Sequence, residues 1–186
     1  MEQTFWNIPE KAEGANNIVI VGGGVVGCET AHWLANEYGK NVTVLEMLPH
    51  FMMGVCTANR GHLLHYLEKS GVRLYNCTKV KALAKDGVYV EQNQSQTVPD
   101  PYNTWQPLLP PNIPNPMEKA IKEEIVEKKI PADLIVLAMG GKADETFFFE
   151  AGEEHLAKEI YNIGDSSRAG RVLEAVRGAY HLAVRI

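Results

Sequence analysis

The residues with the clearest chemical potential form a glycine-rich run near the start of the chain. Glycines at positions 22, 24 and 27 have the spacing G-x-G-x-x-G. In that pattern the first glycine allows a tight turn, the second lets the backbone approach a pyrophosphate, and the third lets a helix pack closely. Glu46 follows Gly22 by 46 − 22 = 24 residues, near the roughly 20 residues expected for an acid that binds a ribose. The spacing predicts a dinucleotide site.

Glu46 also bears on which dinucleotide would bind. A carboxylate repels a ribose 2′-phosphate, and Met47-Leu48-Pro49 supplies no arginine to receive one. His50 could add only a weak cation. The sequence therefore favours NAD(H) over NADP(H). The alternative to a dinucleotide site at these glycines is a glycine-rich turn that binds nothing.

Five segments must position these residues. Apolar β-branched runs predict strands, and apolar residues at helical spacing predict helices. The order is strand 18–21, helix 27–38 with Gly39 as its stop, strand 42–46, helix 57–69 and a strand from 71 to 75. This alternation predicts an α/β fold, a Rossmann-like parallel sheet with crossover helices.

The pattern then changes. Strands 80–83 and 88–91 flank Asp86-Gly87, which predicts a small antiparallel β excursion. The other expected segments are a surface loop at 99–116 with seven of the ten prolines, a short solvated helix or strand excursion at 117–129, a buried strand at 132–138, a short strand at 160–163 and a helix at 171–186.

Composition excludes several classes of protein. Eighteen basic residues against 23 acidic ones give a charge of −5, without the basic footprint of a nucleic-acid binder. No apolar run reaches the ~18 residues that suggest a membrane span, and the N-terminal residues do not resemble a secretory signal. Cys28, Cys56 and Cys77 contain no C-x-x-C pair. They are too few for a four-cysteine metal site, and as free thiols they suit the cytoplasm.

Longer runs carry a family resemblance. Gly22-Gly23-Gly24-Val25-Val26-Gly27-Cys28-Glu29-Thr30-Ala31 and the end of the second strand, Val44-Leu45-Glu46-Met47, resemble old-yellow-enzyme-like NADH:flavin oxidoreductases. These are enzymes of the 2,4-dienoyl-CoA reductase and enoate reductase type, within the pyridine nucleotide-disulfide reductase superfamily. Ala132–Gly140 resembles the strand that returns beneath the dinucleotide. Ile160–Asp165 resembles the second FAD motif of that family.

The resemblance implies a set of cofactor-binding residues and no catalytic or metal-binding residue. Glu29 would orient the nicotinamide carboxamide, although an acid in a first helical turn is also favoured by the helix dipole alone. Gly164 and Asp165 would contact FAD. The remaining residues would contact NAD(H): Gly22, Gly23, Gly24, Val25, Val26, Gly27, Glu46, Met47, Ala138 and Gly140.

The resemblance also implies a division of the chain. It makes 18–157 the NAD(H)-binding domain and 158–186 the returning segment of an FAD-binding domain. Residues 1–17 are polar with one proline, and this composition predicts a linker or an artificial start. Whole members add a first FAD unit and a barrel that carries FMN and an iron–sulfur cluster. The chain thus resembles an excised piece that would not turn over substrate alone. Its helix at 171–186 would then be exposed, misplaced or buried in a homodimer.

In the intact family, NADH reduces FAD, and electrons pass through the cluster to FMN, which reduces an activated C=C bond. The barrel and FAD domain would be the partners of this chain. Two alternatives stay open at this point: a stand-alone NAD(H)-binding redox-sensing module, and an interaction domain whose nucleotide site has decayed.

Weaker candidates have structural alternatives. Tyr75 and Lys79 match Y-x-x-x-K, the catalytic pair of short-chain dehydrogenases. In those enzymes a helix places both residues on one face, whereas here the run follows a predicted strand. His62 and His65 with Cys56 could bind zinc, or the histidines could be surface residues. Arg168 and Arg171 could lie near an FAD pyrophosphate or on a solvated helix face. Tyr102 and Trp105 could cover the nicotinamide or pack within their own loop.

Overall fold

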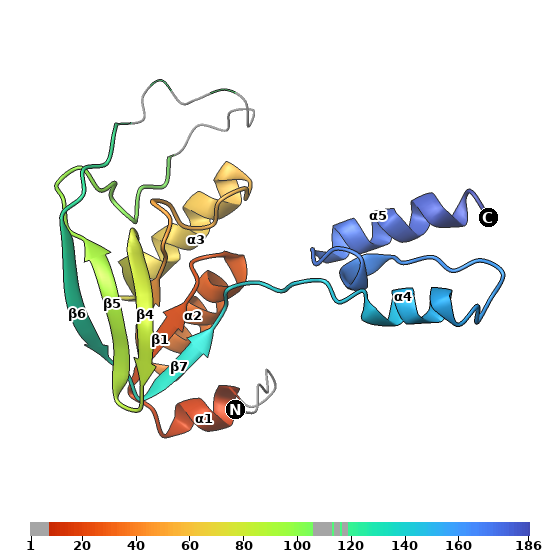
Figure 1. Ribbon diagram of the computed structural model, residues 1–186. Helices are drawn as coiled ribbons and strands as arrows, with labels where there is room; N and C mark the ends of the chain where they lie inside the picture. Colours follow the sequence, from red (N-terminus) through yellow and green to blue (C-terminus); the bar gives the residue numbers. More distant parts are fainter. Residues whose placement is uncertain (1–7, 106–112, 114–115, 117–118) are drawn as a thin grey trace. The chain divides into compact units, whose positions relative to one another are not determined.

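The apolar β-branched runs form a parallel sheet of four strands. They are β1 (Asn17–Val21), β2 (Asn41–Leu45), β3 (Arg73–Tyr75) and β7 (Leu134–Leu137), in the order β3-β2-β1-β7. Val21 aligns with Leu45 and Leu137, so the strands end at one common edge. The α/β, Rossmann-like prediction is confirmed (Figure 1).

The computed structural model describes residues 8–105, 113, 116 and 119–186. The described residues divide into two compact units, one that ends at Met139 and one that spans Gly140–Ile186. Residues 106–112 and 114–115 of the expected proline-rich loop, and 117–118, lie outside the described residues.

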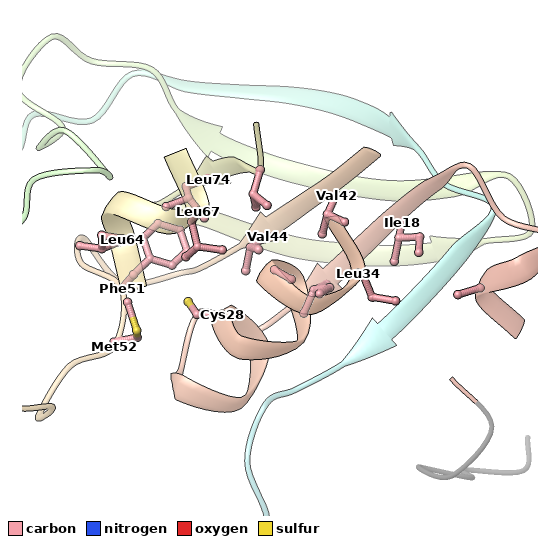
Figure 2. Close-up of a cluster of buried hydrophobic side chains, with 14 of the residues drawn as sticks. Ile18, Cys28, Leu34, Val42, Val44, Phe51, Met52, Leu64, Leu67 and Leu74 are labelled. Atoms are coloured by element: carbon pink, nitrogen blue, oxygen red, sulfur yellow. The ribbon is translucent and has the colours of Figure 1, made fainter. Parts of the chain in front are cut away.

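Two helices cover one face of the parallel sheet. α2 (Val25–Tyr38) ends at Gly39, whose φ of 61° is left-handed, and α3 (Thr57–Lys69) has the predicted bounds. Figure 2 shows the core on this side. Its buried members come from both helices, from alternate positions of the strands and from the loop after β2, and include Ile18, Leu34, Val44, Phe51 and Leu64.

A second sheet covers the other face. β4 (Thr78–Ala84), β5 (Gly87–Asn93) and β6 (Ile125–Pro131) are antiparallel in the order β4-β5-β6. Val88 and Ile130 pack with Val19 and Val21 in a second core cluster. The β excursion is confirmed, and of the two alternatives for 117–129 the strand is the one that forms.

Two expectations in this unit are corrected. Residues 8–13 of the expected linker form helix α1 (Ile8–Glu13). Its Ala12 is completely buried in the first core cluster, so packing rather than local pattern supports it. β7 is only partly buried, because it lies at the edge of the described sheet rather than inside it.

The unit Gly140–Ile186 contains α4 (Thr146–Glu153), the short 3₁₀ helix η2 (Gly164–Ser166) and α5 (Val172–Ala183). The predicted helix at 171–186 is confirmed, but the predicted strand at 160–163 is not formed. A strand needs a ladder partner, and the described residues of this unit form no other strand. No helix in the described part of the chain is long and apolar enough to cross a membrane.

Candidate dinucleotide site

The glycine loop begins where β1 ends and is fixed between two neighbouring strands. The Gly22 amide donates to the Leu45 carbonyl at 2.9 Å, and the Ala138 amide donates to Val21 at 2.8 Å. Gly22 has a φ of 114°, and a Cβ there would lie 2.3 Å from the Ala138 carbonyl oxygen. Glycine is therefore required both by the turn and by the close approach of the chain after β7.

The start of α2 is built to leave amides free. The first helical bond runs from the Cys28 amide to the Gly24 carbonyl at 3.0 Å. The amides of Val25, Val26 and Gly27 precede this bond and have no acceptor within the helix. Gly24 is the N-cap and has no side chain that could accept from them. These amides and the positive end of the helix dipole suit a phosphate.

Gly24 and Gly27 differ in what surrounds them. A Cβ on Gly27 would lie 2.0 Å from the Gly22 carbonyl oxygen, so only glycine lets α2 begin against the turn. A Cβ on Gly24 would meet no atom within 4 Å. The backbone of Gly24 is thus open to an approaching group.

Glu46 joins the end of β2 to the glycine loop. Its Oε2 accepts from the Gly23 amide at 2.8 Å, and its Oε1 accepts from the Leu48 amide at 2.8 Å. A carboxylate offers about four lone-pair directions, so about two remain for other donors. Glu46 can therefore hold the loop and accept from hydroxyls together. Met47 beside it is 66% exposed.

The loop at 47–56 lies against Gly23. The Met52 amide donates to the Gly23 carbonyl at 2.8 Å. Phe51 is buried so close that a Cβ on Gly23 would lie 2.4 Å from the Phe51 ring. Sequence reasoning missed both residues; the signal was a run of large apolar side chains inside a predicted loop.

Two buried polar side chains fasten that loop to a second one. Arg60 donates from Nε to the Phe51 carbonyl at 2.9 Å and from Nη1 to the Asn103 carbonyl at 3.0 Å. Asn76 donates from Nδ2 to the Pro49 carbonyl at 2.7 Å and to the Pro99 carbonyl at 2.8 Å. We call Arg60 and Asn76 the loop clasp. No motif in the sequence marks either residue.

Cys28 packs beneath the glycine loop as a neutral group. Burial, followed by the negative charges of Glu46 and Glu29, raises the pKa of its thiol to about 12. The thiol is then protonated at neutral pH and is no nucleophile. Cys28 therefore acts here as a small buried apolar side chain.

The other predicted site residues fall in both units. Glu29 is exposed on α2, and Ala138 is half-buried, 3.3 Å from where a Cβ on Gly27 would lie. Gly140 and Gly164 have φ values of 83° and 69°. Asp165 accepts from the Gly170 amide at 3.2 Å.

Two of the weaker candidates lie in surroundings that suit structure better than chemistry. Tyr75 ends β3 and Lys79 lies in β4, so no helix presents them together. The Tyr102 hydroxyl donates to the Val72 carbonyl at 2.5 Å and accepts from the Leu74 amide at 3.3 Å. Tyr102 therefore packs locally beside β3.

The other weaker candidates have local partners of their own. His62 and His65 meet the Tyr66 ring edge-on. Arg171 is paired with Glu174 at 2.7 Å. His62, His65 and Arg171 therefore each contact a residue close to them in sequence.

Known oxidoreductases are similar to this chain in sequence. The chain is 27% identical over 169 residues to an NADH oxidase from Thermoanaerobacter brockii, covering 91% of this chain and 21% of that protein. It is 22% identical over 180 residues to a cinnamate reductase from Clostridium sporogenes, covering 95% and 22%. The chain thus spans about a fifth of the length of these relatives.

Solved structures show the same fold. A 2-naphthoyl-CoA reductase complex has a TM-score of 0.68 at 23% identity, over 100% of this chain and 25% of that one. A histamine dehydrogenase from Rhizobium has a TM-score of 0.66 at 14% identity, over 92% and 22%. The family model described as pyridine nucleotide-disulphide oxidoreductase matches residues 5–169. The chain belongs to this family of FAD- and NAD(P)H-using oxidoreductases.

Proposed function

We propose that this chain binds NADH and presents it to FAD for hydride transfer. When both are bound, the nicotinamide supplies a hydride and the flavin accepts it. The chain's own task is to bind and orient the dinucleotide. The observation that carries the proposal is the glycine loop, open at Gly24 and joined by the Gly23 amide to the carboxylate of Glu46.

Each part of the loop has a role in this proposal. The pyrophosphate lies against Gly24 and accepts from the amides at the start of α2. The free lone pairs of Glu46 accept from the adenosine ribose hydroxyls. Ala138 and Gly140 belong to the segment beneath the dinucleotide, and Glu29 orients the nicotinamide carboxamide.

The surroundings of Glu46 support a preference for NADH over NADPH. The carboxylate repels a 2′-phosphate, and the exposed Met47 and Leu48 beside it carry no charge to receive one. Met47 would contact the adenosine without forming an ion pair.

The unit Gly140–Ile186 supports a smaller contribution to FAD binding. Gly164 and Asp165 would lie near the ribityl phosphate, and the bond from Asp165 to Gly170 orders the turn before α5. The division proposed from the resemblance is an NAD(H)-binding domain at 18–157 and a returning FAD segment at 158–186, whereas the two compact units separate between Met139 and Gly140. The rest of the FAD site would come from a longer parent chain.

For that parent we propose reduction of an activated C=C bond in the cytoplasm, through a barrel with FMN and an iron–sulfur cluster. The name of the cinnamate reductase relative supports this class of substrate. The three cysteines of this chain are too few for a four-cysteine cluster, so such a cluster would lie in the barrel.

The decisive experiment is a calorimetric titration of wild type and Gly24→Ala with NADH, NADPH and FAD. An alanine at 24 has space in the free protein and an ordinary φ of −71°, but its methyl group occupies the place proposed for the pyrophosphate. We expect NADH affinity to fall at least roughly tenfold, about 1.4 kcal/mol. The N-cap change alone should cost less than about 1 kcal/mol of stability.

Gly14→Ala is the matched control, because a Cβ there also meets nothing within 4 Å. It should bind NADH as wild type does. Equal NADH binding by Gly24→Ala and wild type would overturn the proposed site. A folded wild type that binds no nicotinamide dinucleotide would overturn the proposed function.

A further inference from the structure

We infer that the loop clasp, Arg60 and Asn76, positions the loop at 47–56 for the adenosine end of the dinucleotide. The inference rests on the proposed function. It assigns a role to two side chains that do not themselves reach the glycine loop.

The first support is that an arginine is buried with no carboxylate partner among the described residues. Arg60 is 3% exposed, and the ion pairs of the described residues do not include it. A buried cation is costly unless it is hydrogen-bonded. Its bonds go to the carbonyls of Phe51 and Asn103, and desolvation lowers the pKa of its guanidinium. A role in holding the Phe51 and Asn103 carbonyls in place would explain why the chain bears the free-energy cost of burying this guanidinium.

The second support is that Asn76 repeats the arrangement independently. It is 4% exposed and bridges the carbonyls of Pro49 and Pro99. Each clasp residue therefore takes one carbonyl from the loop at 47–56 and one from the segment at 99–103. Two separate side chains joining the same two segments argue for a fixed relationship between them.

The third support is the path from the clasp to the glycine loop. Arg60 fixes the Phe51 carbonyl, the Phe51 ring lies against Gly23, and the next residue, Met52, donates to the Gly23 carbonyl. Gly23 in turn donates to Glu46, the proposed ribose acceptor. Loosening the clasp should therefore disturb the adenosine side of the site.

The test compares Arg60→Met, Arg60→Lys and Asn76→Ala with wild type, using NADH and ADP-ribose as probes. We expect the Met and Ala variants to lose roughly tenfold in affinity, about 1.4 kcal/mol, for both probes alike, because ADP-ribose contains the adenosine end. Lysine can still donate to a carbonyl and should restore part of the loss. Arg73→Met and Asn36→Ala, at exposed positions, are the matched controls.

Hydrogen exchange separates positioning from general destabilisation. In Arg60→Met the Met52 amide should exchange faster, while the amides of Ile20 and Val44 in the central strands keep their protection. Faster exchange at all three, or wild-type affinity for both probes, would overturn the inference. So would a loss of NADH affinity with none for ADP-ribose.

The same measurements distinguish this inference from the proposed function. A wild-type chain that binds neither probe overturns the proposed function and, with it, the ligand part of this inference. The exchange of the Met52 amide in Arg60→Met then still decides whether the clasp orders the loop. A wild type that binds both probes, with variants that bind equally well, overturns the clasp alone.

Discussion

Glu46 Oε2 lies 2.8 Å from the amide nitrogen of Gly23, so the acid at the end of β2 is bonded to the turn at the end of β1. One side chain thus holds the loop and, in the proposed function, recognises the ligand. Replacing it must change stability and selectivity together.

Glu46→Gln is expected to show both effects. The new amide group presents a donor to either the Gly23 or the Leu48 amide, which leaves one of them without an acceptor. The Gly23 bond is partly buried and the Leu48 bond is exposed, so the loss in the free energy of unfolding reaches about 1–3 kcal/mol when the Gly23 amide is the one without an acceptor and is smaller when it is the Leu48 amide. The ratio of NADPH to NADH dissociation constants should also fall. Urea unfolding and calorimetric titration measure the two effects, and the exposed Glu68→Gln should show neither.

Gly27→Ala should destabilise the protein more than Gly24→Ala does. A Cβ at 27 would lie 2.0 Å from the backbone oxygen of Gly22, and neither backbone segment can move aside easily. Overpacking of this kind costs about 1–3 kcal/mol, and each kcal/mol lowers the melting temperature by roughly 2–4 °C for a chain of this size. Calorimetric melting compares it with Gly14→Ala. An unchanged transition would mean that α2 does not begin against the turn.

Asp133 should make stability depend on pH. The amides of Asn17 and Asn16 donate to its carboxylate and lower its pKa below the ordinary 3.8. A carboxyl group whose pKa is lower in the folded state than in the unfolded state stabilises the fold. This stabilisation is fully present above the pKa of the unfolded state and is lost as pH falls through the pKa of the folded state. The stability difference between wild type and Asp133→Asn should therefore narrow as pH falls from 6 to below about 4. Urea unfolding at several pH values measures it, and a difference that is constant with pH would contradict it.

The cysteines should differ in reactivity. The pKa of about 12 keeps the buried Cys28 protonated, whereas Cys56 is exposed. At neutral pH, iodoacetamide should alkylate Cys56 first and leave Cys28 unmodified in the folded protein. Mass spectrometry of digests reads the sites, and denaturant should make Cys28 reactive. Rapid labelling of Cys28 without denaturant would show that this core is open.

α5 should make the chain associate. Val172, Val176 and Tyr180 lie at helical spacing and are 59–80% exposed. We propose that this apolar face pairs with that of a second copy when the chain is alone. Light scattering should then show a dimer that Val176→Glu converts to monomer, with NADH affinity unchanged. A monomeric wild type would contradict the proposal.

Local patterns were sufficient to predict the part of the fold that carries the site. β1, α2, β2, α3 and β3 follow one another with clear apolar periods, and the glycine spacing lies at the first crossover. The errors arise where long-range contacts decide. α1 forms because Ala12 packs into a core made by other elements. Residues 160–163 find no ladder partner in the described part of the chain. The roles of Arg60 and Asn76 could not be predicted from the sequence, because their acceptors include backbone carbonyls that are distant in sequence.

The loop clasp has an evolutionary consequence. Every residue type has a carbonyl, so the bonds of Arg60 and Asn76 place no direct requirement on the side chains at 49, 51, 99 and 103. These positions can diverge, as far as the clasp is concerned, while the two loops stay joined. A comparison of related sequences would then find no paired substitutions between the two loops, although the clasp holds them in a fixed position relative to each other.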